Sequence, residues 1–226
     1  MTQLIPPGKT RILLVEGRDD KEFFIQLGAH LGFDDATPIH ILEYGGRDGL
    51  AHRLHLLTQD QAFPTVSVIG VVRDADYKTD ALQSIQDAIR TCNRNGPIEL
   101  SIPQSALEPT SGQPAISALL LPAIGREGML EDMVLDALND DPVFGCADEF
   151  FECLQRSDIP VAKHRLPKAK VRVFISGKNA AVSAVGDDIN RQYFSDIYRM
   201  SWWQPEFWDH PAFNNAKTFL HQLLAD

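Results

Sequence analysis

Two aspartates follow directly after an apolar segment in the middle of the chain. Residues 66–76 read V-S-V-I-G-V-V-R-D-A-D, which predicts a buried strand that runs into Asp74 and Asp76. In an open α/β sheet, the carboxyl ends of the strands border the crevice where ligands bind. Because residues i and i+2 of an extended backbone point to the same side, we expect both carboxylates to face one ion.

Further acidic residues follow two other apolar runs. Glu16 comes directly after residues 11–15, and Glu131 with Asp132 lies beyond residues 116–122. Mg²⁺ prefers oxygen ligands and usually takes one or two carboxylates while it keeps several waters. Carboxylates that converge without a cation repel one another, which raises their pKa values and costs stability. The pattern favours a magnesium site, although aspartates after a strand also serve as turn residues and helix caps, and D-x-D alone does not decide between the two.

Strands and helices are predicted to alternate along the first part of the chain. Continuous apolar runs indicate buried strands, and apolar stripes at helical spacing indicate the helices that follow them. The predicted strands are residues 11–15, 39–44, 66–76 and 116–122, and the predicted helices begin near Asp19, Asp48, Thr79 and Met129. Asp19 with Glu22 three residues on favours the start of the first helix. Four such units predict an α/β fold with a doubly wound, mostly parallel, four-stranded sheet and helices on both faces.

The strand signal fades beyond Asn139. Helices are predicted at residues 144–154, 180–194 and 213–224. We therefore expect an α/β core at residues 1–138 and a helical C-terminal elaboration at residues 139–226, packed together as one compact unit. An aromatic cluster near the C-terminus, formed by Trp202, Trp203, Phe207 and Trp208, is expected to dock the tail onto the body by packing, although aromatic side chains also stack on bases.

Composition narrows the class of protein. The formal net charge of −10 means that a nucleic-acid partner must be met by a local basic patch or through bound cations. Residues 163–178 carry seven basic or histidine side chains and no acid, which fits either a phosphate-backbone track or an exposed helix face. No apolar run approaches the roughly 20 residues of a membrane span. Three cysteines without C-x-x-C, and a start unlike a signal peptide, favour a cytoplasmic protein with buried, reduced thiols.

The ordered motifs carry a resemblance to a known superfamily. The segment L-L-V-E-G-R-D-D at 13–20, together with D-A-D at 74–76, resembles the Toprim domain of topoisomerases, primases and OLD-type nucleases. With G-G-R-D-G at 45–49, V-V-R-D-A-D at 71–76 and G-M-L-E-D at 128–132, most of residues 11–138 resembles a little-characterised Toprim-related family that is similar to the OLD nucleases. The order and spacing of the motifs are more specific than any one of them.

The resemblance implies a Toprim-like fold and a set of site residues. It implies that Glu16 is a metal ligand or general acid/base, and that Asp74 and Asp76 bind the catalytic divalent ion. Asp20 and Glu131 match positions that help to hold metal in OLD-type nucleases, where two ions stabilise an in-line phosphoryl displacement. Topoisomerase-type sites often continue to a third aspartate, whereas Tyr77 and Lys78 follow Asp76 here. Topoisomerase activity is therefore disfavoured.

Basic residues beside these motifs are candidates for contacts with substrate phosphate. They are Arg47, Arg73 and Lys78, which can act as charge-assisted donors or remain solvated at the surface. The function expected from the whole pattern is a Mg²⁺-dependent phosphodiester hydrolase, with Mn²⁺ as the alternative ion, acting on DNA or RNA in defence or repair. The alternatives are nucleotidyl transfer and an interaction module that is non-catalytic or depends on a partner such as an ATPase. The number of ions, the strandedness of the substrate and the oligomeric state stay open.

Overall fold

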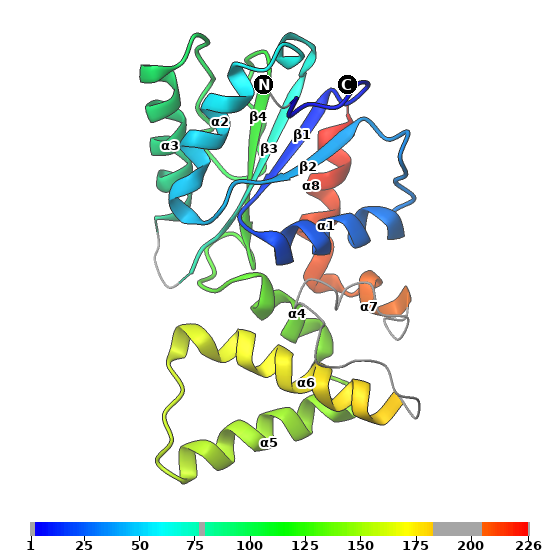
Figure 1. Cartoon of the computed structure of the whole chain (residues 1–226). Coiled ribbons are helices and arrows are strands. Elements are labelled where there is room, and N and C mark those ends of the chain that lie inside the picture. The colour runs from blue at the N-terminus through cyan, green and yellow to red at the C-terminus, as the bar shows by residue number, and fades with distance from the viewer. Residues whose placement is uncertain (1–2, 77–79, 183–204, 226) are drawn as a thin grey trace.

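A computed structural model describes residues 3–76, 80–182 and 205–225 of the chain (Figure 1). The strands are β1 (Arg11–Val15), β2 (Ile39–Glu43), β3 (Val68–Asp74) and β4 (Ala115–Leu121). The α-helices are α1 (Arg18–His30), α2 (Leu50–Thr58), α3 (Ala81–Asn95), α4 (Leu130–Leu138), α5 (Pro142–Arg156), α6 (Leu166–Val182), α7 (Pro205–Asp209) and α8 (Asn214–Leu224). Short 3-10 turns are η1 (Arg47–Gly49), η2 (Phe63–Thr65), η3 (Lys163–Arg165) and η6 (Pro211–Phe213).

The four strands form one parallel sheet in the order β2-β1-β3-β4. Arg11 at the start of β1 pairs with Ile39 of β2 on one side and with Val68 of β3 on the other. The strands therefore leave the sheet at one common edge, and each connection between them crosses over through a helix. The predicted mostly parallel, four-stranded α/β sheet is confirmed, and the strands begin and end within two residues of the apolar runs that indicated them.

Helices cover both faces of the sheet, as the sequence predicted. Alternate residues of a strand point to opposite faces, so Ile12 and Leu14 of β1 pack toward α2 and α3, while Leu13 and Val15 pack toward α1 and α8. All four of these side chains are fully buried. Burial on both faces explains why β1, β3 and β4 read as mostly continuous apolar runs, whereas the edge strand β2, I-H-I-L-E, is only partly buried.

The C-terminal helix α8 returns to the sheet and packs on the same face as α1 (Figure 1). A Cβ at Gly70 of β3 would lie 2.9 Å from Cδ2 of Leu223, so glycine at this position allows α8 to approach the strand. Nε of Arg11 donates a hydrogen bond of 2.8 Å to the carbonyl of Leu223. The end of the chain is therefore fixed to the start of β1.

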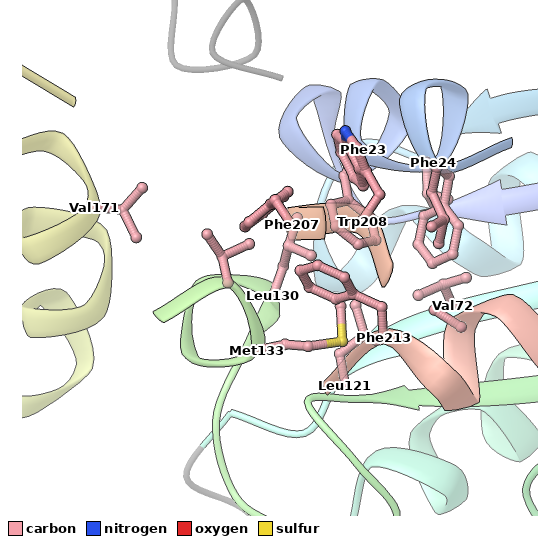
Figure 2. Close-up of a cluster of buried hydrophobic side chains, with 14 of the residues drawn as sticks. Phe23, Phe24, Val72, Leu121, Leu130, Met133, Val171, Phe207, Trp208 and Phe213 are labelled. Carbon is pink, nitrogen blue, oxygen red and sulfur yellow. The ribbon is translucent and has the colours of Figure 1, made fainter. Parts of the chain in front are cut away.

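An aromatic cluster joins α1, α7 and α8 to the sheet (Figure 2). The ring centroid of Phe23 lies 5.6 Å from that of Trp208 and 5.4 Å from that of Phe213, and Phe207 lies 5.0 Å from Trp208. The prediction that the C-terminal aromatic residues serve packing is confirmed for Phe207 and Trp208. Trp202 and Trp203 lie outside the described residues.

Helices α5 and α6 form a hairpin that projects from the body of the molecule, and α6 packs against α4 (Figure 1). An exposed helix face was one of two alternatives for residues 163–178, and the helix expected at 180–194 overlaps α6 only at residues 180–182; its remainder lies outside the described residues. The buried side chains of Val171, Phe174 and Ile175 give α6 an apolar stripe. They stand among lysines and arginines, which obscure their helical spacing in the sequence.

The three cysteines differ in their exposure to solvent. Cys92 is buried, but Cys146 and Cys153 on α5 are exposed, so the expectation of buried thiols is wrong for these two. They lie on the projecting hairpin, where little packs over them. In the part of the chain that the structure describes, no helix has the length and apolar character to cross a membrane.

Candidate active site

Glu16 leaves β1 at the carboxyl edge of the sheet, and a glycine turn holds its backbone. The N–H groups of Gly45 and Gly46 donate hydrogen bonds of 3.1 Å and 3.0 Å to the carbonyl of Glu16. Both glycines have positive φ values, 82° and 85°, which residues with a Cβ rarely adopt. The G-G pair after β2 is therefore a turn that positions Glu16 from the neighbouring strand.

Asp74 is the last residue of β3 and contacts the start of α4. Its Oδ1 accepts a hydrogen bond of 3.0 Å from the backbone N–H of Leu130. A carboxylate is stabilised at a helix N-terminus because the unpaired N–H groups and the helix dipole favour negative charge. This contact brings the beginning of α4, with Glu131, to the end of β3.

Asp20 lies in the first turn of α1 and is buried. The helix begins at Arg18 with Gly17 as its N-cap, and Oδ2 of Asp20 accepts a hydrogen bond of 3.0 Å from the N–H of Gly17. The expectation that Asp19 caps this helix is wrong, because the residue that reaches back to the N-cap backbone is the one at the third helical position.

Glu16, Asp20, Asp74 and Glu131 line one pocket of about 180 Å³, which we call the acidic pocket. The structure thus brings together four of the five acidic residues that the sequence analysis singled out. Asp19 also lines the pocket, and so does Lys168 of α6, whose Nζ lies 3.6 Å from Oε1 of Glu131. Lys168 was not predicted as a site residue, because no motif spacing connects it to acids that lie far from it along the chain.

Burial and mutual repulsion govern the protonation of the acidic pocket. Burial, with the negative charges of Glu131 and Glu16 acting in the same direction, raises the pKa of Asp20 to about 7. Burial likewise raises the pKa of Asp74 well above its ordinary value, together with the charges of Asp20, Glu131 and Glu16. The pocket is therefore short of positive charge.

Glu131 is the most enclosed of the four acids. Its side chain is 1% exposed, and Oε2 is buried without a hydrogen-bond partner among the described residues. Burial raises the pKa of Glu131, while the positive charge of Lys168 acts in the opposite direction. Burial alone would lower the pKa of Lys168, but nearby carboxylates, Glu131 first, raise it. Lys168 thus supplies part of the missing positive charge.

Asp76 is oriented differently from the sequence expectation. Its φ is 51°, so the backbone is left-handed there, and its carbonyl accepts a hydrogen bond of 2.6 Å from the N–H of Gly128. The expectation that Asp74 and Asp76 project in parallel from an extended strand is therefore wrong, because β3 ends at Asp74. Asp76 still lies near the site: burial is the main cause that raises the pKa of Glu16, and the charge of Asp76 adds to it.

Arg73 lies beneath the acidic residues rather than at the surface. Its side chain is 2% exposed, and its two terminal nitrogens donate hydrogen bonds of 2.9 Å to Oγ of Ser84 and to the carbonyl of Arg47. The guanidinium also lies 5.5 Å from the ring centroid of Tyr44. These contacts hold the strand end in place, and the phosphate contact of Arg73 stays a prediction.

Arg47 and Lys78 are the other two basic candidates for contact with substrate phosphate. Arg47 is partly exposed and lies 3.6 Å from Oδ1 of Asp80. Both residues border a small cleft that also contains Asp74 and Asp76. Lys78 lies outside the described residues.

The donor set of the acidic pocket suits a hard divalent cation. Carboxylate oxygens are the ligands that Mg²⁺ prefers, and the unpartnered Oε2 of Glu131 can accept a cation or a metal-bound water. Within the described ranges, no three or more Asp, Glu, His and Cys side chains form a ready-made ligand cluster. The residues therefore fit an open site in which the ion keeps several waters, not a closed all-protein cage.

The basic segment at residues 163–178 is not uniform in the structure. Nζ of Lys170 lies 2.5 Å from Asp148, and Nζ of Lys178 lies 2.5 Å from Asp141, so these two lysines tie α6 to α5 and its N-cap. A larger cavity of about 670 Å³ lies within the hairpin, but none of the four carboxylates lines it. This cavity is therefore not the candidate active site, although it is larger than the acidic pocket.

A solved structure has a similar fold. The C-terminal region of the Burkholderia pseudomallei OLD protein is similar in structure, with a TM-score of 0.50 and 13% sequence identity. The alignment covers 96% of this chain and 99% of that one. At this identity the likeness concerns the fold, and it supports the OLD-like part of the resemblance found in the sequence motifs.

The sequence comparison gives the family. Residues 10–225 match the family described as "Protein of unknown function (DUF3226)", and the chain belongs to this family. No curated protein matches the sequence.

Proposed function

We propose that this protein is a Toprim-type phosphodiester hydrolase that cleaves DNA or RNA with Mg²⁺, or with Mn²⁺ in its place. The proposal depends on one observation above all. Glu16, Asp20, Asp74 and Glu131 come from separate segments and line one pocket at the carboxyl edge of a parallel sheet. The similarity of the fold to the C-terminal region of an OLD protein supports a nuclease-related family.

Asp74 and Glu131 are the residues proposed to hold the ion, with Asp20 and Asp76 beside them. When bound, the ion would neutralise charge on the phosphate and lower the pKa of a coordinated water. Glu16 has a pKa raised by burial, which suits a residue that accepts a proton from an attacking water. Lys168, whose side chain is 46% exposed at this pocket, can donate a charge-assisted hydrogen bond to a phosphate oxygen.

The test is cleavage of plasmid, single-stranded DNA and single-stranded RNA by the full chain with Mg²⁺, with Mn²⁺ and with EDTA. Asp74→Asn and Glu131→Gln are expected to abolish cleavage and to weaken metal binding measured by calorimetry. Asp136→Asn is the matched control, because it removes a carboxylate from α4 that pairs with Arg126 outside the acidic pocket. Metal-dependent cleavage retained by Asp74→Asn would refute the proposal.

One observation favours a second function, that of a partner-dependent module. Lys168 already supplies positive charge to Glu131, so the pocket has a partial internal counter-ion. As a partner-dependent module, the protein would bind metal weakly and cleave only in complex with a partner such as an ATPase. Metal binding without cleavage by the isolated chain, followed by cleavage once the partner is added, distinguishes it from a self-sufficient hydrolase.

A further inference from the structure

The cations of α6 divide into two sets by the direction in which they point. Lys170 and Lys178 pair with Asp148 and Asp141 on the side of α5. Lys168 points to the acidic pocket, where it contacts Glu131. Arg172, one helical turn further on, lies near the same pocket: burial raises the pKa of Asp19, and the charges of Lys168 and Arg172 oppose that shift.

The second set is extended by Arg165, which ends η3 directly before α6 begins at Leu166. Arg165 precedes Lys168 by three residues and Arg172 follows it by four, a spacing that places side chains on one side where helical turns run on from one another, as η3 and α6 do. All three are exposed. At a rise of 1.5 Å per residue, they span about 10 Å along the helix axis. We call Arg165, Lys168 and Arg172 the α6 basic face.

We propose that the α6 basic face binds neighbouring phosphates of one nucleic-acid strand and guides that strand across the acidic pocket. The inference rests on the proposed function and adds the surface that holds the substrate. Successive phosphates of one strand rise by about 3.4 Å in a duplex, so a span of about 10 Å matches a short run of them. Lys168 lies at the pocket itself, and the two arginines contact phosphates on either side of it.

The charge of the whole chain makes this face distinctive. The net charge is −10, yet no Asp or Glu occurs from Lys163 to Lys178. A polyanion approaching the molecule is repelled by most of the surface and attracted where cations are concentrated. Arginine fits this role because its guanidinium donates to two phosphate oxygens at once. Although the hairpin projects away from the sheet, one side of α6 borders the acidic pocket, so the hairpin can hold substrate there.

The experiment measures binding apart from cleavage. Fluorescence anisotropy of a labelled oligonucleotide, single-stranded and duplex, is recorded in EDTA over a series of salt concentrations. The variant Arg165→Ala/Arg172→Ala is expected to bind about 10-fold or more weakly than the wild type at low salt. The slope of log K against log salt should fall by about 1.4 for the single strand and about 1.8 for the duplex. Arg165→Lys/Arg172→Lys should recover most of the affinity.

The matched control removes the same charge elsewhere. Arg90→Ala/Arg94→Ala takes two arginines from α3, which covers the opposite face of the sheet, and should leave affinity and salt slope unchanged. Equal binding by wild type and the α6 variant, or an equal loss in the α3 variant, overturns the inference. Thermal unfolding of both variants checks that the fold is kept.

Cleavage distinguishes failure of this inference from failure of the proposed function. With Mg²⁺, the α6 variant should show a raised KM and a nearly unchanged kcat. A wild type that cleaves with Mg²⁺ while the α6 variant keeps its KM leaves the hydrolase standing and removes the guiding face. A wild type that binds through the α6 basic face but never cleaves supports the face and refutes the hydrolase. A wild type that neither binds nor cleaves refutes both.

Discussion

The backbone N–H of Leu130 donates a hydrogen bond of 3.0 Å to Oδ1 of Asp74, which joins the end of β3 to the start of α4 across 56 residues. Glu131 directly follows Leu130 in the sequence, so this bond also places Glu131 at the acidic pocket. Burial raises the pKa of both Asp74 and Glu131. The surroundings of Asp74 depend on the position of α4, and those of Glu131 depend on the position of β3. The two acids therefore act as one structural unit.

Asp74→Asn separates the charge of Asp74 from its structural hydrogen bond. The amide oxygen of asparagine can still accept from Leu130, so α4 keeps its position, while one of several repelling charges is removed. We expect the free energy of unfolding without metal to rise by about 1 kcal/mol and cleavage to fall by about 100-fold or more. Urea unfolding with and without Mg²⁺, beside the cleavage assay, measures both effects.

Asp74→Ala is the control for the hydrogen bond. It removes the same charge and also the acceptor for Leu130, so it should be about 1 kcal/mol less stable than Asp74→Asn. Equal stability of the two variants would mean that the contact contributes nothing measurable to the position of α4.

The fold was largely predictable because β1, β3 and β4 are mostly buried and read as apolar runs. The runs at residues 11–15, 39–44, 66–76 and 116–122 need no knowledge of the tertiary structure to be recognised. The helix α6 stayed only one of two alternatives for residues 163–178, because its buried residues are few and separated by cations that face α5 and the acidic pocket. Its spacing at Val171, Phe174 and Ile175 was a usable signal.

The candidate site was predictable where strand ends define it and not where tertiary contacts do. Glu16 and Asp74 follow from the rule that ligands bind at the carboxyl ends of parallel strands. The left-handed backbone of Asp76 accompanies its contact with Gly128, which is distant in the sequence. The burial of Arg73 likewise depends on its contacts with Tyr44, Ser84 and Arg47. Lys168 reaches the pocket only because the hairpin folds against α4, and local sequence patterns carry no information about that contact.

Lys168→Met should reveal how much the internal cation contributes. Without Lys168, Glu131 loses the nearest positive charge, but the lysine is 46% exposed and its attraction is screened by water. We expect a loss of about 1 kcal/mol in the free energy of unfolding without metal. Added Mg²⁺ should stabilise this variant more than the wild type, because metal and lysine neutralise the same carboxylates.

Calorimetry and thermal unfolding with increasing Mg²⁺ measure this competition. Lys170→Met is the control, since Lys170 pairs with Asp148 on α5 and does not line the acidic pocket. If both variants respond to Mg²⁺ as the wild type does, Lys168 does not compete with the ion.

Arg73→Met should destabilise the protein and change the protonation of Glu16. The substitution leaves the carbonyl of Arg47 and Oγ of Ser84 without their donor, at a cost of about 2 kcal/mol. The positive charge of Arg73 opposes the effect of burial on the pKa of Glu16, so its removal should raise that pKa further. Urea unfolding measures the loss of stability, and the titration of Glu16 by NMR measures the shift. Arg73→Lys keeps the charge and should leave the pKa of Glu16 nearer to that of the wild type.

The acidic pocket should make the metal-free protein less stable as pH rises from about 4 to about 7. Burial and the charges of Glu131 and Glu16 together raise the pKa of Asp20 from 3.8 to about 7, so over this range the folded protein binds more protons than the unfolded chain does. Stability then falls with rising pH, by at most about 1.4 kcal/mol per pH unit for each such proton. Asp74, Glu131 and Glu16 have raised pKa values and act in the same direction.

His40 acts against this trend and calls for a matched comparison. Burial lowers the pKa of His40, so its protonation favours the unfolded chain below its ordinary value of 6.5, and stability from this residue increases as pH rises. Urea unfolding of wild type and Asp20→Asn between pH 5 and pH 8 isolates the carboxylate, because His40 is present in both. The variant should lose less stability with rising pH, and Mg²⁺ should stabilise the wild type more at pH 7.5 than at pH 5.5 because metal and protons compete for the carboxylates. Identical pH profiles for the two proteins would show that Asp20 is already ionised throughout this range and that its burial is compensated in the folded protein.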